Sequence, residues 1–329
     1  MKRYASTGFI SAVFMVFVLL FSSCGGGGSS GSSSGGGTNT YSGLTTPAQI
    51  TEDNAEEILL SAFSGGDLGS GISGAFSAVD ARKAQTPGAL MVQRVALKVR
   101  DLVNREANGV CPAASAVQTQ NIDIDGECGG SLTGTINVND ETGAMSGSLT
   151  YSNFCEMGAR MNGAISFSGS MDLESGEFSL NMTCTNITEV DAELGINVTM
   201  TGTVTLQATE TSMTMVMDIY MRNNAAAESF LMEDYTLTMV MDEYEYSAET
   251  TISGRLYCSE YGYVTLSTQD TIIVYEFDEY PSQGAFVATG ASGSRARLTF
   301  ISSETYRIEV DEDGNGDYEY DSGIIYWDE

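Results

Sequence analysis

Histidine is absent from the 329 residues of this chain, and basic residues are scarce, with 14 Lys and Arg against 44 Asp and Glu. Without histidine there is no Ser-His-Asp triad, no histidine general base and no histidine metal ligand. The formal net charge of −30 argues against nucleic-acid binding, because proteins hold phosphate backbones with Lys and Arg. Neighbouring carboxylates such as Glu243 and Glu245 resemble an acid–base pair, but so acidic a chain produces such pairs by chance. The composition favours a protein that is not an enzyme and has no nucleic-acid partner.

Long hydrophobic runs are also lacking. The apolar stretch from Phe9 to Phe21 follows Lys2 and Arg3 and is shorter than the ~20 residues of an ordinary membrane-spanning helix. A basic start, a short apolar middle and small residues before the cut are typical of a signal peptide. The sequence therefore predicts a signal peptide over residues 1–23.

The end of this segment, Leu20-Phe21-Ser22-Ser23-Cys24, resembles the lipobox of a bacterial lipoprotein signal, with Phe21 where that pattern usually has leucine. The resemblance implies cleavage before Cys24 and acylation of that cysteine, so that the membrane is a partner through the lipid. Gly25 follows the cysteine in place of aspartate, which in lipoproteins implies release to the outer membrane. The lipoprotein would then lie on either the periplasmic or the cell-surface face of that membrane. Residues 44–329 resemble no specific family.

A flexible tether is expected after the lipidated cysteine. Residues 25–37 contain only glycine and serine, and such a tract behaves as a random coil. A tether over 24–43, of about 20 residues, has an r.m.s. span of roughly 25 Å. It lets a folded domain stand clear of the membrane surface.

Two helices are predicted within residues 44–110. The first begins with Thr51 as its N-cap and carries acidic residues in its first turn; its apolar positions at helical spacing are Ala55, Ile58, Leu59 and Ala62. The second begins at Thr86-Pro87 and ends at Asn108-Gly109. Its apolar stripe consists of Val92, Val95, Ala96, Val99, Leu102 and Val103.

Charge is distributed unevenly between this helical segment and the remainder. Six of the 14 basic residues lie within 82–105, whereas residues 111–329 hold 36 of the 44 acidic ones. We therefore hypothesise that the second helix packs on the following domain, with its stripe inward and its basic flank toward acidic rims. The alternative is that the basic flank meets anionic lipid.

From residue 130 onward, apolar and polar side chains alternate with a period of two. Val198, Met200, Val204 and Leu206, for example, alternate with threonines, which is typical of antiparallel strands with one buried face. Turn clusters rich in Asp, Asn, Ser and Gly separate the runs. Residues 111–329 are thus expected to form a mainly β domain, a large antiparallel meander sheet arranged as an open barrel or a wrapped sandwich and preceded by the two helices.

The first hairpin of this domain has a register that two features support. Pairing Val138 with Met145 places the apolar side chains of both strands on one side, and the same register sets Cys128 opposite Cys155. A one-residue slip would reverse every side chain, so the agreement is informative. We predict a Cys128–Cys155 disulfide, which an exported protein permits. The other mature cysteines are Cys111, Cys184 and Cys258. Because their number is odd, one of them should be free or paired elsewhere.

An acidic turn near the C-terminus is the strongest metal candidate. Asp311, Asp313, Asn315, Asp317 and Glu319 offer oxygen ligands at alternate positions, with glycines for a sharp bend, as calcium loops do. The first half of this segment fits an EF-hand loop. The twelfth position of such a loop is a serine here, however, and the residues before the segment have the pattern of a strand. The alternative is a plain Asp/Asn/Gly turn between strands. Calcium is the one cofactor that the sequence suggests.

Methionine stripes suggest an apolar lining. Met213, Met215 and Met217 form one row, and Met239 and Met241 form part of the next. Methionine is soft and adapts to irregular ligands, but an ordinary Met-rich core is the favoured explanation of the rows. We expect a non-catalytic binding or structural surface module, with protein, polysaccharide or lipid as candidate partners. The alternative is a periplasmic carrier that holds an apolar or lipid ligand in a Met-lined cavity.

Overall fold

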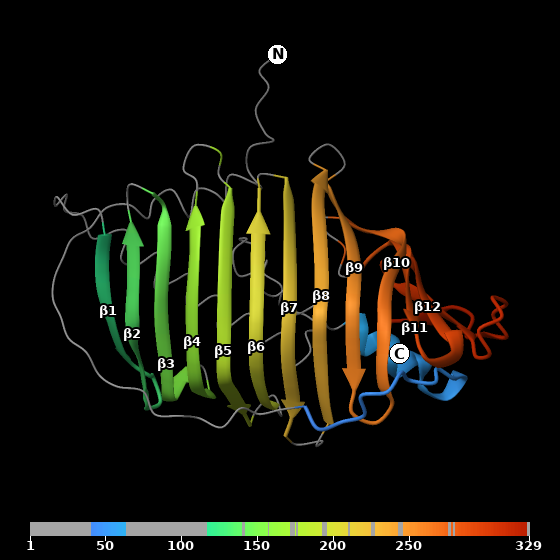
Figure 1. Cartoon of the computed structure of the whole chain (residues 1–329), viewed down its shortest axis with the longest axis horizontal. Coiled ribbons are helices and arrows are strands. Elements are labelled where there is room, and N and C mark those ends of the chain that lie inside the picture. The colour runs from blue at the N-terminus through green and yellow to red at the C-terminus, as the bar shows by residue number, and fades with distance from the viewer. Residues whose placement is uncertain are drawn as a thin grey trace, which may run out of the picture.

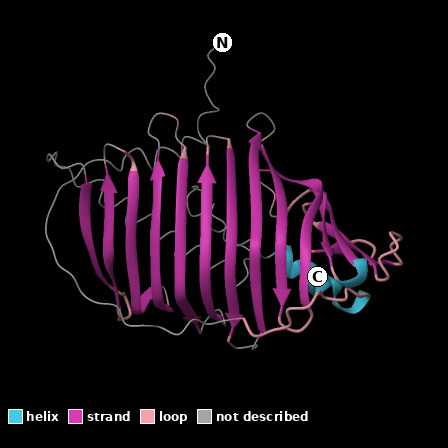
Figure 2. Ribbon diagram, viewed as in Figure 1, coloured by secondary structure: helices cyan, strands magenta, loops and turns pink. Residues whose placement is uncertain are grey.

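One open antiparallel sheet of 15 strands dominates the protein (Figures 1 and 2). The strands follow one another in chain order from β1 at one edge to β14, and β15 pairs with β13 off this path. The computed structural model describes residues 41–63 and 117–327, apart from residues 140–141, 157, 172–174, 176, 193–195, 210, 225–227, 243–245, 276–277 and 279.

Short turns join nearly all neighbouring strands, as a meander requires. The first ten strands are β1 (Val117–Asp125), β2 (Ser131–Asn139), β3 (Ala144–Glu156), β4 (Ala159–Met171), β5 (Phe178–Asp191), β6 (Ile196–Ala208), β7 (Ser212–Asn223), β8 (Glu228–Asp242), β9 (Ser247–Cys258) and β10 (Gly262–Tyr275). The shorter ones are β11 (Gln283–Thr289), β12 (Arg295–Ser302), β13 (Thr305–Asp311), β14 (Tyr320–Asp321) and β15 (Ile325–Tyr326). A single 3₁₀ turn, η1 (Ala291–Gly293), separates β11 from β12.

The predicted alternation is confirmed and gives the sheet two unlike faces. In β5, Leu180, Met182 and Cys184 are buried, while the polar residues between them are exposed. The ladder carries this pattern across the sheet, since Met182 lies opposite Phe167 of β4 and Val204 of β6. We call the apolar side the inner face and the polar side the outer face.

The sheet is open, and the expected barrel or sandwich was wrong in this respect. Each strand makes its extensive contacts with its neighbours in the ladder order, so the described strands form a single layer. Within the described part of the chain, β1 pairs with β2 alone and is the first strand of the sheet. Alternation specifies which face is apolar, but it carries no information on whether two distant edges meet.

A row of β-bulges crosses the sheet between β3 and β9. Asn153, Asn186 and Asp234 adopt positive φ at register shifts in β3, β5 and β8, a conformation that Asn and Asp tolerate best after glycine. Glycines face them across the ladder: at Gly254 φ is +123° and an added Cβ would lie 2.5 Å from the Asp234 carbonyl oxygen. Because bulges bend strands and increase twist, this row lets so wide a sheet curve.

The first described residues, 41–50, form what we call the N-terminal strap, which crosses the lower ends of β8–β10 in Figure 1. The Tyr263 amide donates to the Thr46 carbonyl at 2.9 Å, and the Ala48 amide donates to the Tyr263 carbonyl at 2.8 Å. Ala48 and Ile50 at its end are fully buried. The strap therefore leads the chain from the sheet's end onto the inner face.

A helix over residues 52–63 follows the strap and confirms the first predicted helix. The Thr51 amide donates to Asn54 Oδ1 at 2.9 Å, the reciprocal half of a capping box. The four predicted apolar positions, Ala55, Ile58, Leu59 and Ala62, are all fully buried.

The described residues contain this one helix rather than the two expected. The second expected helix, from Thr86-Pro87 to Asn108-Gly109, lies outside the described residues, as do the signal peptide, Cys24 and the tether. In the part of the chain that the structure describes, no helix has the length and apolar character needed to cross a membrane.

An aromatic cluster joins the helix to the C-terminal end of the sheet. The Trp327 ring lies 4.5 Å from that of Tyr280 and 4.2 Å from that of Tyr306, measured between centroids. Phe63 packs 5.5 Å from the same tryptophan. The only tryptophan of the chain thus reports on the packing of the helix against β13 and β15.

Candidate functional site

Hydroxyl and amide side chains form cross-strand rows on the outer face. Thr205 Oγ1 donates to Asn181 Oδ1 at 3.0 Å between β6 and β5, and Thr119 Oγ1 donates to Asn137 Oδ1 at 2.7 Å between β1 and β2. Strands are ~4.8 Å apart, so hydrogen-bonding groups recur at that spacing. Further members of the two central rows are Ser146, Ser148, Ser166, Ser168, Thr183 and Thr203.

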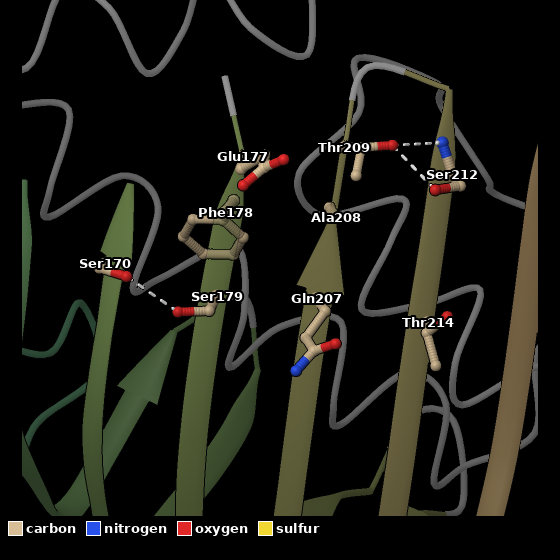
Figure 3. Close-up of a pocket in the computed structure, with 9 residues that line it drawn as sticks. All are labelled: Ser170, Glu177, Phe178, Ser179, Gln207, Ala208, Thr209, Ser212 and Thr214. Carbon is tan, nitrogen blue, oxygen red and sulfur yellow. Dashed lines mark hydrogen bonds between the residues drawn. The ribbon is translucent and has the colours of Figure 1, made fainter. Parts of the chain in front are cut away.

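The outer face is hollowed at the upper ends of β4–β7, where a shallow cavity of about 350 Å³ lies (Figure 3). Ser170 and Ser179 share a hydrogen bond of 3.0 Å on one side, and Thr209 and Ser212 share one of 2.8 Å on the other. The remaining lining residues are Glu177, Phe178, Gln207, Ala208 and Thr214. The cavity therefore offers five hydroxyls, one amide and one carboxylate.

This lining suits binding better than bond cleavage. Glu177 is the one ionisable group of the lining, whereas hydrolysis by carboxylates requires a positioned pair. Sequence reasoning did not find this cavity, because its residues come from four strands and serines and threonines are common throughout the domain. The one available clue in the sequence was the turn-forming residues next to the ends of these strands.

The five predicted lining methionines lie together on the inner face of β7 and β8. Met215 and Met217 are fully buried, and the other three are partly exposed. Met213 stands opposite Met239 in the ladder, and Met241 continues the row. The cavity of Figure 3 is on the opposite face and touches none of them.

The acidic turn 311–319 connects β13 to β14 and is closed by its own hydrogen bonds. Asp311 is fully buried; its two carboxylate oxygens accept the Gly314 amide at 2.8 Å and the Gly316 amide at 2.9 Å. Arg295 Nη2 lies 3.4 Å from the same carboxylate. The carboxylate is thus already hydrogen-bonded and charge-compensated by the protein.

Three of the five predicted calcium ligands come together in this turn. Asp311, Asp313 and Glu319 each offer one carboxylate oxygen, all within 4.8 Å of one another. Asn315 donates its amide to Glu319 at 3.4 Å, and Asp317 is not part of the group. The structure brings together carboxylates that could hold a cation, beside an arginine that competes with it.

Glu312 has a role that the sequence did not reveal. Its Oε1 accepts the Glu52 amide at 2.7 Å, and its carbonyl oxygen accepts Gln49 Nε2 at 2.8 Å. A carboxylate at a helix N-terminus is favoured by the helix dipole. The acidic turn therefore holds the start of the helix, a contact that no local pattern near residue 312 indicated.

The predicted disulfide is confirmed, with the Cα atoms of Cys128 and Cys155 5.1 Å apart. Cys184 and Cys258 are buried free thiols, and burial raises the pKa of each to about 12. Thiols with so high a pKa are poor nucleophiles. Cys111 lies outside the described residues.

A tyrosine cluster on the outer face receives the beginning of the strap. The Tyr41 ring packs edge-on against those of Tyr220 and Tyr257, at 6.3 Å and 5.8 Å. Burial raises the pKa of Tyr41 to about 12. Arg255 lies 5.4 Å over the Tyr263 ring and pairs with a neighbouring glutamate. These contacts place the chain just after the predicted tether on the outer face.

Comparisons with protein-family models, with curated proteins and with solved structures find no match to this chain. Functional inference therefore depends on the residues and geometry described above. The outer-face cavity, the acidic turn and the inner-face methionines are the three candidate sites.

Proposed function

We propose that this chain is an exported, lipid-anchored envelope protein whose outer sheet face binds a neutral polysaccharide without modifying it. The observation that carries the proposal is the set of cross-strand rows of hydroxyl and amide side chains on the outer face, together with the cavity at the upper ends of β4–β7. Sugars present matching donors and acceptors. A net charge of −30 disfavours anionic polymers through repulsion.

Binding is tested on the chain that begins at residue 25. Its mobility is measured in native gels that contain neutral glucans, mannans or galactans, one at a time. Gln207→Ala should weaken retardation about fivefold, which corresponds to one lost hydrogen bond. Thr251→Ala, on the outer face of β9, is the matched control and should leave retardation unchanged. Equal mobility in all neutral polymers would contradict the proposal.

Anchoring is the second element of the proposal, supported by the lipobox and the Gly/Ser tether. Between Cys24 and Tyr41 a flexible chain has an r.m.s. span of roughly 22 Å, which keeps the outer face accessible beside a membrane. Bacteria fed a fatty-acid analogue should label the wild-type protein in the outer-membrane fraction. Cys24→Ala should lose the label; a variant that keeps it would refute acylation at Cys24.

Calcium binding is the third element of the proposal and concerns only the acidic turn. The carboxylates of Asp311, Asp313 and Glu319 support it, and Arg295 opposes it. A rise in melting temperature on adding calcium, abolished by Asp313→Asn, is the expected result. Equal melting temperatures in calcium and in chelator would mean that hydrogen bonds and Arg295 suffice to close the turn.

A carrier of an apolar ligand is the competing proposal, and the inner-face methionines favour it. It requires that the inner face be open to cargo. Native mass spectrometry of the purified chain tests it, since a lipid-sized mass lost on denaturation would support a carrier. Whether the inner face can hold a cargo decides between the carrier and the polysaccharide-binding module.

A further inference from the structure

The outer face of β2–β6 carries almost no charge. Glu189 and Asp191 continue the buried row of β5. Glu156 lies on the inner side of β3, opposite the buried Ala159. Of the described side chains in these strands, only Arg160, at the lower end of β4, is both charged and turned outward. The outer face is thus a wide neutral field in a chain that holds 44 acidic residues, whereas exposed faces usually mix charges of both signs.

Hydroxyl and amide side chains fill this neutral field in two rows, to which each strand contributes one residue per row. Both rows continue into β1, through Thr119 and Asn121. Both lose this character in β7, where Val216 and Asp218 take the next positions. The upper row consists of Asn137, Ser146, Ser168, Asn181 and Thr205, and the lower row consists of Thr135, Ser148, Ser166, Thr183 and Thr203.

The spacing of these groups differs between the two directions of the sheet. Neighbours within a row are one strand apart, ~4.8 Å, whereas the two rows are two residues apart along each strand, ~6.8 Å. Successive sugars of an extended β-1,4-linked chain recur about every 5 Å, which matches the spacing between strands and not the spacing along them. In Figure 1, β2–β6 run side by side with little splay, so the rows do not fan out. A polymer that crosses the strands can therefore meet both rows at every sugar.

Hydrogen bonds within the upper row orient its two amides. Asn137 Oδ1 accepts the Thr119 hydroxyl at 2.7 Å, and Asn181 Oδ1 accepts the Thr205 hydroxyl at 3.0 Å. The amide nitrogens can then donate to a ligand, while the hydroxyl oxygens of the rows can accept from it. Sugar hydroxyls both donate and accept, so they suit such a surface. The cavity of Figure 3 adjoins the upper row, since Ser170 lies two residues beyond Ser168 in β4.

We propose that the outer face of β1–β6 binds an extended, unbranched, neutral β-linked glycan that runs across the strands, with one sugar over each strand. This inference rests on the proposed function, because it specifies the polysaccharide and its direction on the same face. A chain that coils, such as an α-1,4-linked glucan, cannot keep one sugar over each strand. An anionic polymer meets no counter-charge in the neutral field and is repelled by the acidic chain around it.

Titration calorimetry with oligosaccharides of increasing length tests the match in the chain that begins at residue 25. Affinity for β-1,4-linked gluco- or manno-oligosaccharides should rise up to about six sugars, one for each of β1–β6, and then level off. The α-1,4-linked hexasaccharide should bind about tenfold more weakly, because it leaves several row positions without a partner. Equal affinity for α- and β-linked hexasaccharides, or affinity that is constant beyond a disaccharide, would overturn this inference and leave polysaccharide binding in place. Absence of binding to every neutral polymer would overturn both.

A variant at one end of the upper row tests the direction of the polymer. Asn137→Ala in β2 should weaken binding of the β-linked hexasaccharide about fivefold, as expected for one lost hydrogen bond. The same variant should change trisaccharide binding by less than about twofold, because a short chain can occupy β3–β6 instead. Thr251→Ala, on the outer face of β9 and outside both rows, is the matched control and should change neither affinity. An unchanged hexasaccharide affinity in Asn137→Ala would show that the polymer does not cross the strands and would overturn the inference.

Discussion

Removal of the Cys128–Cys155 disulfide gives a quantitative test of the β1–β3 end. The bridge joins the β1–β2 turn to the end of β3, across 27 positions of sequence. Closing a loop of this length in the unfolded chain corresponds to about 3.5 kcal/mol in the chain-entropy treatment. The Cys128→Ala, Cys155→Ala double variant should therefore lose about that much free energy of unfolding.

Urea unfolding of the chain beginning at residue 25 measures this loss. Fluorescence of Trp327 and far-UV circular dichroism should give coincident transitions, as a cooperative unit requires. Reduced wild-type protein is the matched control and should agree with the double variant to within about 1 kcal/mol. A loss below about 1 kcal/mol would show that the β1–β3 end unfolds separately from the rest, and the entropy argument would fail.

Three further predictions follow from single contacts. Tyr235→Phe should lower the free energy of unfolding by about 1–3 kcal/mol, because the buried Ala62 carbonyl loses a donor; the exposed Tyr246→Phe should have no effect in the same urea assay. Gly254→Ala should cost about 1–3 kcal/mol, since its φ is +123° and its Cβ would meet a carbonyl oxygen; unchanged stability would contradict the bulge geometry. The hydrogen bonds from Arg307 lower the pKa of Asp321 from 3.8 to about 2, so the stabilisation is present above about pH 4 and is lost as the pH falls through 2; an NMR titration midpoint near 4 would exclude the pair.

Local chemistry was sufficient for several features of the fold. The helix at 52–63 could be placed because capping and apolar spacing act within one or two turns. The hairpin register, and with it the disulfide, followed from a period of two, because a slip of one residue moves every apolar side chain to the wrong face. These features depend on residues close together in the chain or directly opposite across one turn.

The candidate sites also divide into parts that neighbouring residues reveal and parts that depend on distant strands. The acidic turn was visible because its residues are consecutive, but Arg295 and the contact of Glu312 with the helix involve distant strands. The outer-face cavity gathers serines and threonines from residues 170 to 214, which resemble those of every other strand. Only the alignment of four strand ends distinguishes them.

The sequence by itself determined that this chain forms an antiparallel sheet with one apolar face, a short helix after Thr51 and a Cys128–Cys155 bridge, because each follows from short-range patterns. Only the tertiary structure decided that the sheet stays open, that a row of bulges bends it, and that the strap carries the chain from the outer to the inner face. Edge closure, curvature and layer contacts depend on many weak interactions between residues far apart in the chain. A period of two repeats identically in every strand and so cannot encode them.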